Sequence, residues 1–149
     1  MKLSTKGRYG VRAILDITLN QHAGPVTIHS IAQRQEISER YLEQLLITMK
    51  QNGLIKSIRG FHGGYMLNKE PQDITVGDVV RALEGPIAPV DCVDDSRSGS
   101  CTRLDFCVTR RVWEDLRDAM TEVLDSYTIE DLLAETRKIQ ENSYDNYCI

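Results

Sequence analysis

The stretch that decides the fold is ISERYLEQLLITMKQNGLIKSIRGFHGGYML, residues 37–67. Ser38 is suited to cap a helix over residues 39–51, because its hydroxyl can accept from a backbone N–H of the first turn. Asn52-Gly53 supplies the left-handed backbone that ends such a helix. The helix turns four apolar side chains toward a core: Leu42, Leu45, Leu46 and Met49.

Two helices are predicted upstream of this one. Apolar residues recur at helical spacing over residues 7–22, and Gly24-Pro25 ends that pattern. Thr27 is suited to cap a short second helix over residues 28–35, which leaves only a tight turn before the helix over residues 39–51. The two helices on either side of that turn form a predicted helix-turn-helix.

A β-hairpin is predicted directly downstream. The segments LIKSIRG (54–60) and FHGGYML (61–67) are rich in β-branched and aromatic residues and are joined by a glycine-bearing turn. A helix-turn-helix followed by such a hairpin is typical of a winged helix-turn-helix.

The remaining half alternates helix, loop and helix. A capping-box pattern at Thr75 to Asp78 predicts a helix through Glu84, whereas residues 86–108 lack periodicity and carry three cysteines. Apolar residues then step by 3, 4, 3 and 4 along a heptad seam: Trp113, Leu116, Met120, Val123 and Tyr127. Such a seam predicts a homodimer, although an amphipathic helix packed on its own domain has the same pattern. A final helix is predicted after Thr128.

These elements predict a mainly α fold with a small β-hairpin: a winged helix-turn-helix with a long C-terminal dimerisation helix. We expect a DNA-binding domain over residues 1–85, a cysteine-bearing loop over residues 86–108, and a dimerisation helix with a C-terminal helix or tail over residues 109–149.

Charge is distributed unevenly along the chain. The formal net charge is −4, but residues 1–70 carry ten Lys and Arg against five Asp and Glu. This basic half can face double-stranded DNA even though the acidic remainder cannot. The sequence shows no signal peptide and no membrane-spanning apolar run, so we expect a cytoplasmic protein without a membrane partner. No Ser/His/Asp arrangement, phosphate-binding glycine loop or HExxH motif is present, so we do not expect an enzyme.

Candidate DNA contacts lie on the third helix and on the hairpin turn. A recognition helix reads the major groove with polar side chains of its first turns, which here are Ser38, Arg40, Tyr41, Glu43 and Gln44. In the turn, a guanidinium is followed by residues that allow close backbone approach to a duplex, so the candidates there are Arg59, Gly60, His62 and Gly63. An ordinary solvated helix face and a common Arg-Gly turn are the alternatives.

Three cysteines define the candidate metal site. Cys92, Cys101 and Cys107 are separated by eight and then five residues, in a loop where thiolates can converge. Three soft ligands suit an iron-sulfur centre or zinc, and exposed thiols without a function are the alternative. Spacing alone does not choose between the two metals.

Several stretches together resemble one family: KGRYGVRAILD (6–16), ISERYLEQLL (37–46), NGLIKSIRGFHGGYML (52–67) and ITVGDVVRALEGPIAPV (74–90), followed by the spaced cysteines. They resemble the IscR-like iron-sulfur-sensing transcription regulators, a winged helix-turn-helix family that also includes NsrR-type nitric-oxide sensors and CymR-type repressors. The resemblance implies a homodimer on operator DNA, with a [2Fe-2S] cluster held by the three matching cysteines. It also implies control of genes for iron-sulfur cluster biogenesis or sulfur metabolism.

The sequence departs from the IscR branch at one ligand. That branch has a histidine three residues past the last cysteine, and this chain has Arg110 there, which is not a usable metal ligand. A fourth ligand would have to come from the other subunit, from an exogenous molecule, or from one of these residues: Asp91, Asp94, Asp95, Asp105 and Cys148. The alternatives are zinc, a thiol switch, or a metal-free repressor of cysteine metabolism regulated by a partner enzyme. Iron-sulfur assembly proteins are further possible partners.

Overall fold

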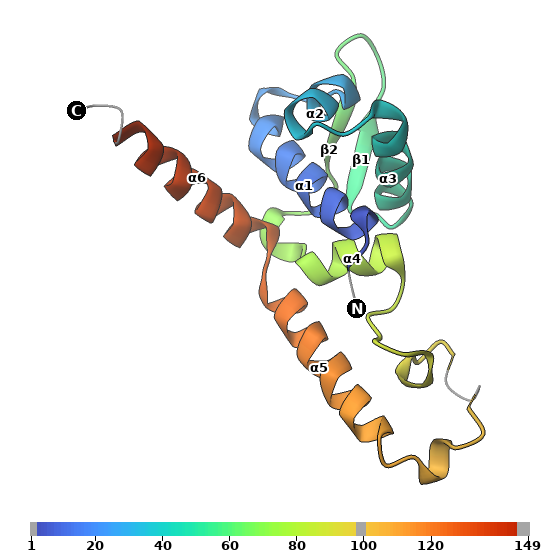
Figure 1. The fold of residues 1–149 in the computed structure, drawn as a ribbon. Helices are drawn as coiled ribbons and strands as arrows, with labels where there is room; N and C mark the ends of the chain where they lie inside the picture. Colours follow the sequence, from blue (N-terminus) through green and yellow to red (C-terminus); the bar gives the residue numbers. More distant parts are fainter. Residues whose placement is uncertain (1–2, 98–100, 146–149) are drawn as a thin grey trace.

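The computed structural model describes residues 3–97 and 101–145. Its helices and strands follow in the order α1 (Thr5–Asn20), α2 (Ile28–Gln35), α3 (Glu39–Gln51), β1 (Ile55–Ile58), β2 (Gly64–Leu67), α4 (Val76–Glu84), α5 (Arg110–Ser126) and α6 (Ile129–Asp145). Short 3₁₀ turns lie at Gln21–Ala23, Pro71–Asp73, Asp91–Val93 and Leu104–Phe106. The predicted fold class, mainly α with one hairpin, is confirmed (Figure 1).

Local capping sets where the helices begin. The hydroxyls of Thr27 and Ser38 accept from the backbone N–H groups of Ser30 and Tyr41, as predicted for α2 and α3. At α4, Thr75 and Asp78 cap each other's backbone in the predicted capping box. The first helix begins earlier than expected, because Ser4 caps it.

One core joins the helix-turn-helix to the hairpin and to the first turns of α4 and α6. It is built from fully buried side chains of several elements, among them Ile14, Ile17, Ile31, Leu42, Leu46, Met49, Ile55, Ile74, Val79 and Ile129. Inside it, the carboxylate of Asp16 is 2% exposed and accepts from Arg34 Nη2 at 2.7 Å, Arg34 Nε at 3.0 Å and Gln35 Nε2 at 2.9 Å. This cluster fixes α2 against α1.

The hairpin is extended by a third segment. β1 and β2 pair antiparallel from Ile55 opposite Leu67 to Ile58 opposite Gly64. Val26, which precedes α2, exchanges two backbone hydrogen bonds with Tyr65, at 2.9 and 2.8 Å. The hairpin is therefore attached to the helix-turn-helix, and its turn projects at the end of the domain opposite α5 (Figure 1).

Helices α5 and α6 extend away from this domain in two different directions (Figure 1). The first turn of α6 is anchored in the core by Ile129 and Leu133. In contrast, no side chain of α5, all of which lies within the described residues, is fully buried. Three residues of the heptad seam, and Val112 beside it, are exposed by 36–58%; the seam residues are Trp113, Val123 and Tyr127, the last of which directly follows α5. In the described part of the chain, no helix is long and apolar enough to cross a membrane.

Candidate nucleic-acid interface and cysteine segment

Helix α3 presents most of the predicted contacts to solvent. Ser38, Arg40, Glu43 and Gln44 are exposed. Tyr41 is half-buried instead and turns toward α1, where its hydroxyl lies 3.0 Å from Thr5 Oγ1. It therefore connects the start of α3 to the start of α1, and DNA contact by these five residues stays a prediction.

Sequence reasoning missed Ile47 on the same helix. Its side chain is 47% exposed, and it lies one turn beyond Glu43 and Gln44. An exposed apolar residue on a recognition helix is suited to contact the methyl group of thymine. The sequence could have indicated this exposure, because Ile47 does not belong to the set of apolar residues that the helical pattern turns inward.

The wing, which we define as residues 55–67, has a tight turn at its tip, between β1 and β2. Gly60 has a φ of +115°, and its carbonyl accepts from the N–H of Gly63 at 3.0 Å. A Cβ on Gly63 would overlap the carbonyl oxygens of Ile58 and Gly60, so only glycine fits there. Arg59, Gly60 and His62 are exposed, as the prediction of DNA contact requires.

The three cysteines lie at three separate points of the cysteine segment, residues 86–108. Cys92 lies in the turn Asp91–Val93, Cys101 lies outside regular structure, and Cys107 directly follows the turn Leu104–Phe106, three residues before α5 begins. All three are half-buried free thiols. Among the residues described here, no group of three or more His, Cys, Asp or Glu side chains is placed to hold a metal ion. Ligation by the three cysteines therefore stays a prediction.

Cys107 has an activated thiol. Its Sγ lies 3.2 Å from the hydroxyl of Thr109, and this hydrogen bond, together with the backbone N–H of Arg110, lowers the pKa of Cys107. The positive charge of Arg103 acts in the same direction. Stabilisation of the thiolate makes Cys107 a better nucleophile and a better metal ligand at neutral pH.

Arg110 is occupied along its own helix. Its Nε lies 3.1 Å from Glu114 Oε1, as an ion pair whose angle is not that of a hydrogen bond. At the position where the resemblance to the IscR branch implies a histidine ligand, this chain therefore has a guanidinium that lies against a carboxylate.

Most predicted fourth ligands already have partners. Asp94 accepts from the backbone N–H of Ser96 at 2.8 Å and from its hydroxyl at 2.6 Å, which lowers the pKa of Asp94. Asp91 pairs with Arg97 at 3.2 Å, and Asp95 lies 3.5 Å from the Arg117 guanidinium. Asp105 is exposed, and the prediction for Cys148 falls outside the described residues.

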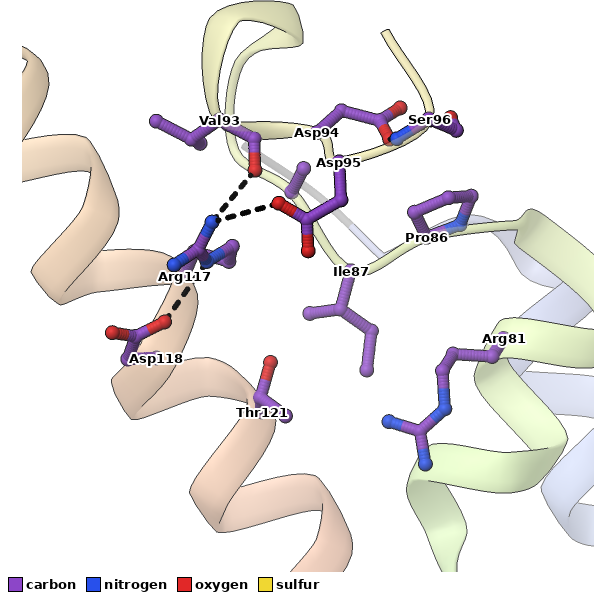
Figure 2. A pocket seen from close by; sticks show the side chains of 11 residues that line it. Arg81, Pro86, Ile87, Val93, Asp94, Asp95, Ser96, Arg117, Asp118 and Thr121 are labelled. Carbon is purple, nitrogen blue, oxygen red and sulfur yellow. Dashed lines mark hydrogen bonds and ion pairs between the residues drawn. The ribbon is translucent and has the colours of Figure 1, made fainter. Parts of the chain in front are cut away.

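Arg117 attaches the cysteine segment to α5. Its Nη1 donates to the carbonyl of Val93 at 3.1 Å, and its Nε donates to Asp118 at 2.9 Å (Figure 2). Val93 itself is 2% exposed. These groups border a cavity of about 480 Å³ that also reaches Arg81 of α4. The cysteine segment, α4 and α5 therefore meet at one place.

A second attachment lies farther along α5. Asp125 accepts from both terminal nitrogens of Arg81 of α4, at 2.7 and 3.2 Å, and from the hydroxyl of Thr75 at 3.3 Å. Helix α5 is thus held to the cysteine segment near its middle and to α4 and its N-cap near its end. Sequence reasoning missed both attachments.

The sequence profile of a family described as "Rrf2: Iron-dependent Transcriptional regulator" matches residues 3–135. The chain is 46% identical to the HTH-type transcriptional regulator CymR of Bacillus subtilis, over 95% of this chain and 96% of that one. It is 42% identical to the HTH-type transcriptional regulator IscR of Escherichia coli, over 89% and 80%. The solved structure of T. potens IscR is similar with a TM-score of 0.77 and 45% identity, over 94% and 91%.

Proposed function

This chain belongs to the Rrf2 family of transcription regulators, whose members are not enzymes, and from that premise we propose that it is a homodimeric regulator whose cysteine segment adjusts its affinity for operator DNA. The observation that carries the proposal is the double attachment of α5, through Arg117 to Val93 and through Asp125 to Arg81. A change in the cysteine segment can thereby reach the unit that holds α3 and the wing.

The DNA-binding half supports the first part of the proposal. Exposed polar residues of α3 and an exposed basic wing lie on one rigid core, within the part of the chain that carries a net positive charge. Helices of this kind enter the major groove, and a dimer reads two half-sites about one helical turn apart. The exposed apolar face of α5 is the surface that a second copy would cover.

Coupling follows from the two attachments of α5, one near its middle at Arg117 and one near its end at Asp125. The two recognition helices of a dimer bind paired half-sites only at one separation, and α5 sets that separation. If one state of the cysteine segment displaces Val93, the strain passes through Arg117 into α5 and through Asp125 into α4. Coupling of this kind is commonly worth about 1–3 kcal/mol, or roughly 5- to 150-fold in affinity.

For the group held by the cysteines, we propose a [2Fe-2S] cluster on Cys92, Cys101 and Cys107. The similarity to IscR proteins and the three half-buried free thiols support it. The described side chains do not by themselves fit such a centre, because no three of their His, Cys, Asp or Glu groups, the three thiols included, are placed together to hold a metal ion. The fourth ligand would have to come from the partner subunit, the C-terminal residues or an exogenous molecule.

A second candidate uses the same segment without a cluster. The pairing of Arg110 with Glu114 and the 46% identity to CymR favour a zinc-bound, thiol-switched or partner-regulated repressor of cysteine metabolism. Its DNA-binding half would work in the same way.

Spectroscopy of protein purified without oxygen separates these candidates. We would record ultraviolet-visible and Mössbauer spectra and assay iron, sulfide and zinc per chain, for the unaltered protein and for Cys92→Ala, Cys101→Ala and Cys107→Ala. A [2Fe-2S] spectrum that each substitution removes supports the cluster. Colourless protein, with zinc or with no metal after anaerobic reconstitution, contradicts it and supports the second candidate. Affinity for a DNA duplex obtained by in vitro selection tests the regulator itself.

A further inference from the structure

We infer, on the basis of the DNA binding proposed above, that Phe61 is an aromatic wedge at the tip of the wing. In the complex its ring would enter the minor groove and pack against deoxyribose and a base step. It would add an apolar, salt-independent contribution to an interface that is otherwise electrostatic.

The first observation is the exposure of the ring. Phe61 is 99% exposed, whereas the next most exposed aromatic ring in the described residues, Phe106, is 88% exposed. Leaving a whole phenyl ring in water is unfavourable. A position at the projecting end of a DNA-binding hairpin provides a reason for such a ring to be retained (Figure 1).

The second observation is that the ring stands on a rigid turn. Phe61 and His62 are the two central residues of the turn closed by the hydrogen bond from Gly63 to Gly60 at 3.0 Å. Their rings lie 5.0 Å apart at 86°, an edge-to-face arrangement. The closed turn therefore fixes the point of the backbone from which the ring projects, which lowers the entropy that binding would cost.

The third observation is the composition of the rest of the wing. Lys56 and Ile58 lie on the same face of β1, and Ile58 is 40% exposed because it lies opposite Gly64, which has no side chain to cover it. Arg59, also exposed, follows directly. A wing that carries two exposed apolar side chains and two exposed cations matches a groove with apolar sugar walls and phosphate rims. It matches a hydrophobic protein partner less well, because Lys56 is of a residue type that is depleted from such interfaces.

Two consequences follow for DNA. A dimer joined through α5 leaves the wing tip uncovered, because the tip lies at the opposite end of the domain (Figure 1). A wedge also favours steps that unstack easily, so Phe61 would favour a pyrimidine-purine step where the wing meets the duplex. Specificity would then extend beyond the bases that α3 touches.

The test compares four full-length variants with the unaltered chain on one duplex, which is recovered by in vitro selection with the unaltered chain. The variants are Phe61→Ala, Phe61→Trp, Arg59→Ala and, as the matched control, Phe106→Ala, which removes a similarly exposed ring from the cysteine segment. Affinity is measured by fluorescence anisotropy between about 50 and 200 mM salt. Because Phe61 is fully exposed, its loss leaves the fold intact, which circular dichroism checks.

We expect Phe61→Ala to weaken binding by about tenfold at every salt concentration with an unchanged salt slope, a size typical of an apolar wedge or stacking contact. Arg59→Ala should instead reduce the slope by about one, as loss of a phosphate contact does. Phe61→Trp and Phe106→Ala should bind like the unaltered protein. If Phe61→Ala binds within twofold of the unaltered protein, the wedge is refuted while DNA binding stands, and a protein partner becomes the better assignment for the ring. If selection recovers no duplex, the proposed function fails and the wedge fails with it.

Discussion

The guanidinium of Arg117 donates to the carbonyl of Val93 at 3.1 Å, across 24 residues of sequence. This hydrogen bond holds the turn that carries Cys92 against the middle of α5. A carbonyl so placed would lose its donor if the turn moved, and an unpaired buried polar group is costly. In the proposed regulator, this hydrogen bond makes Arg117 the first residue to test for coupling between the cysteine segment and α5.

Replacing Arg117 with methionine should uncouple the two. Met keeps the length of the apolar stem but cannot donate to Val93, so the affinity ratio between the metal-loaded or thiol-modified state and the reduced metal-free state should fall toward one. We expect the reduced protein itself to bind the selected duplex within about threefold of the unaltered protein, because Arg117 lies outside the DNA-binding unit. Anisotropy titrations in each state measure the ratio. Arg137→Met, on the exposed face of α6, is the control, and an undiminished ratio in Arg117→Met would contradict the coupling.

The thiol of Cys107 should titrate at lower pH than an ordinary cysteine. Its pKa is lowered by the hydroxyl of Thr109, so Thr109→Val should raise that pKa and move the alkylation profile toward higher pH. Rates of iodoacetamide labelling between pH 6 and 9, followed by peptide mass spectrometry of the reduced metal-free protein, measure the shift. Thr102→Val, in the same segment, controls for the loss of a hydroxyl. A profile that Thr109→Val leaves in place would show that the hydrogen bond does not set the pKa.

The Asp16 cluster should contribute strongly to stability. Asp16→Ala leaves Arg34 and Gln35 without their shared acceptor, and we expect a loss of about 3 kcal/mol in the free energy of unfolding. This loss is at the low end for broken buried ion pairs because the side chain of Arg34 is 40% exposed and remains partly solvated. Urea unfolding followed by circular dichroism measures it, with the exposed Asp115→Ala on α5 as control. Equal midpoints for the two variants would rule out this role.

The exposed seam of α5 should mediate dimerisation. Val123 is 58% exposed, and a glutamate at this position would place two charges in the interface of a symmetric pair. We expect Val123→Glu to sediment as a monomer at micromolar concentration and to bind the selected duplex at least tenfold more weakly, since only one half-site is engaged at a time. Glu122→Gln, a neighbouring exposed position on another face, should remain dimeric. A dimeric Val123→Glu protein would place the interface elsewhere.

Acid should destabilise the fold through its capping carboxylates. At Asp131 the backbone N–H and hydroxyl of Thr128 lower the pKa. A carboxylate with a lowered folded pKa stabilises above its unfolded pKa, near 4, and loses that contribution as pH falls through the folded value. The midpoint of urea unfolding should therefore fall below about pH 4, and Asp131→Asn should lose part of that dependence. An unchanged pH dependence in Asp131→Asn would exclude this cap as a source.

The sequence by itself determined what depends on neighbours a few residues apart. Caps at Thr27, Ser38, Thr75 and Thr128 join residues within one helical turn, and the turn at residues 60–63 is set by its glycines, so local pattern predicts these elements. Helical periodicity likewise predicts the inward face of α3 and the apolar face of α5. The winged arrangement and the candidate DNA contacts follow from that local information.

Only the tertiary structure decided which distant side chains meet. The partners of Asp16, Val93 and Asp125 lie 18, 24 and 44 residues away in sequence, and no local pattern marks them because a polar residue reads alike whether it is paired or solvated. The same reason explains why the sequence did not reveal the position of Tyr41. The pattern placed this residue among the predicted DNA contacts, whereas in the structure its hydroxyl lies beside that of Thr5. The exposure of Phe61 also required coordinates, since an aromatic residue in a hairpin is more often buried than presented to solvent. How the three cysteines are used depends on chain geometry and on partner groups, which their spacing does not encode.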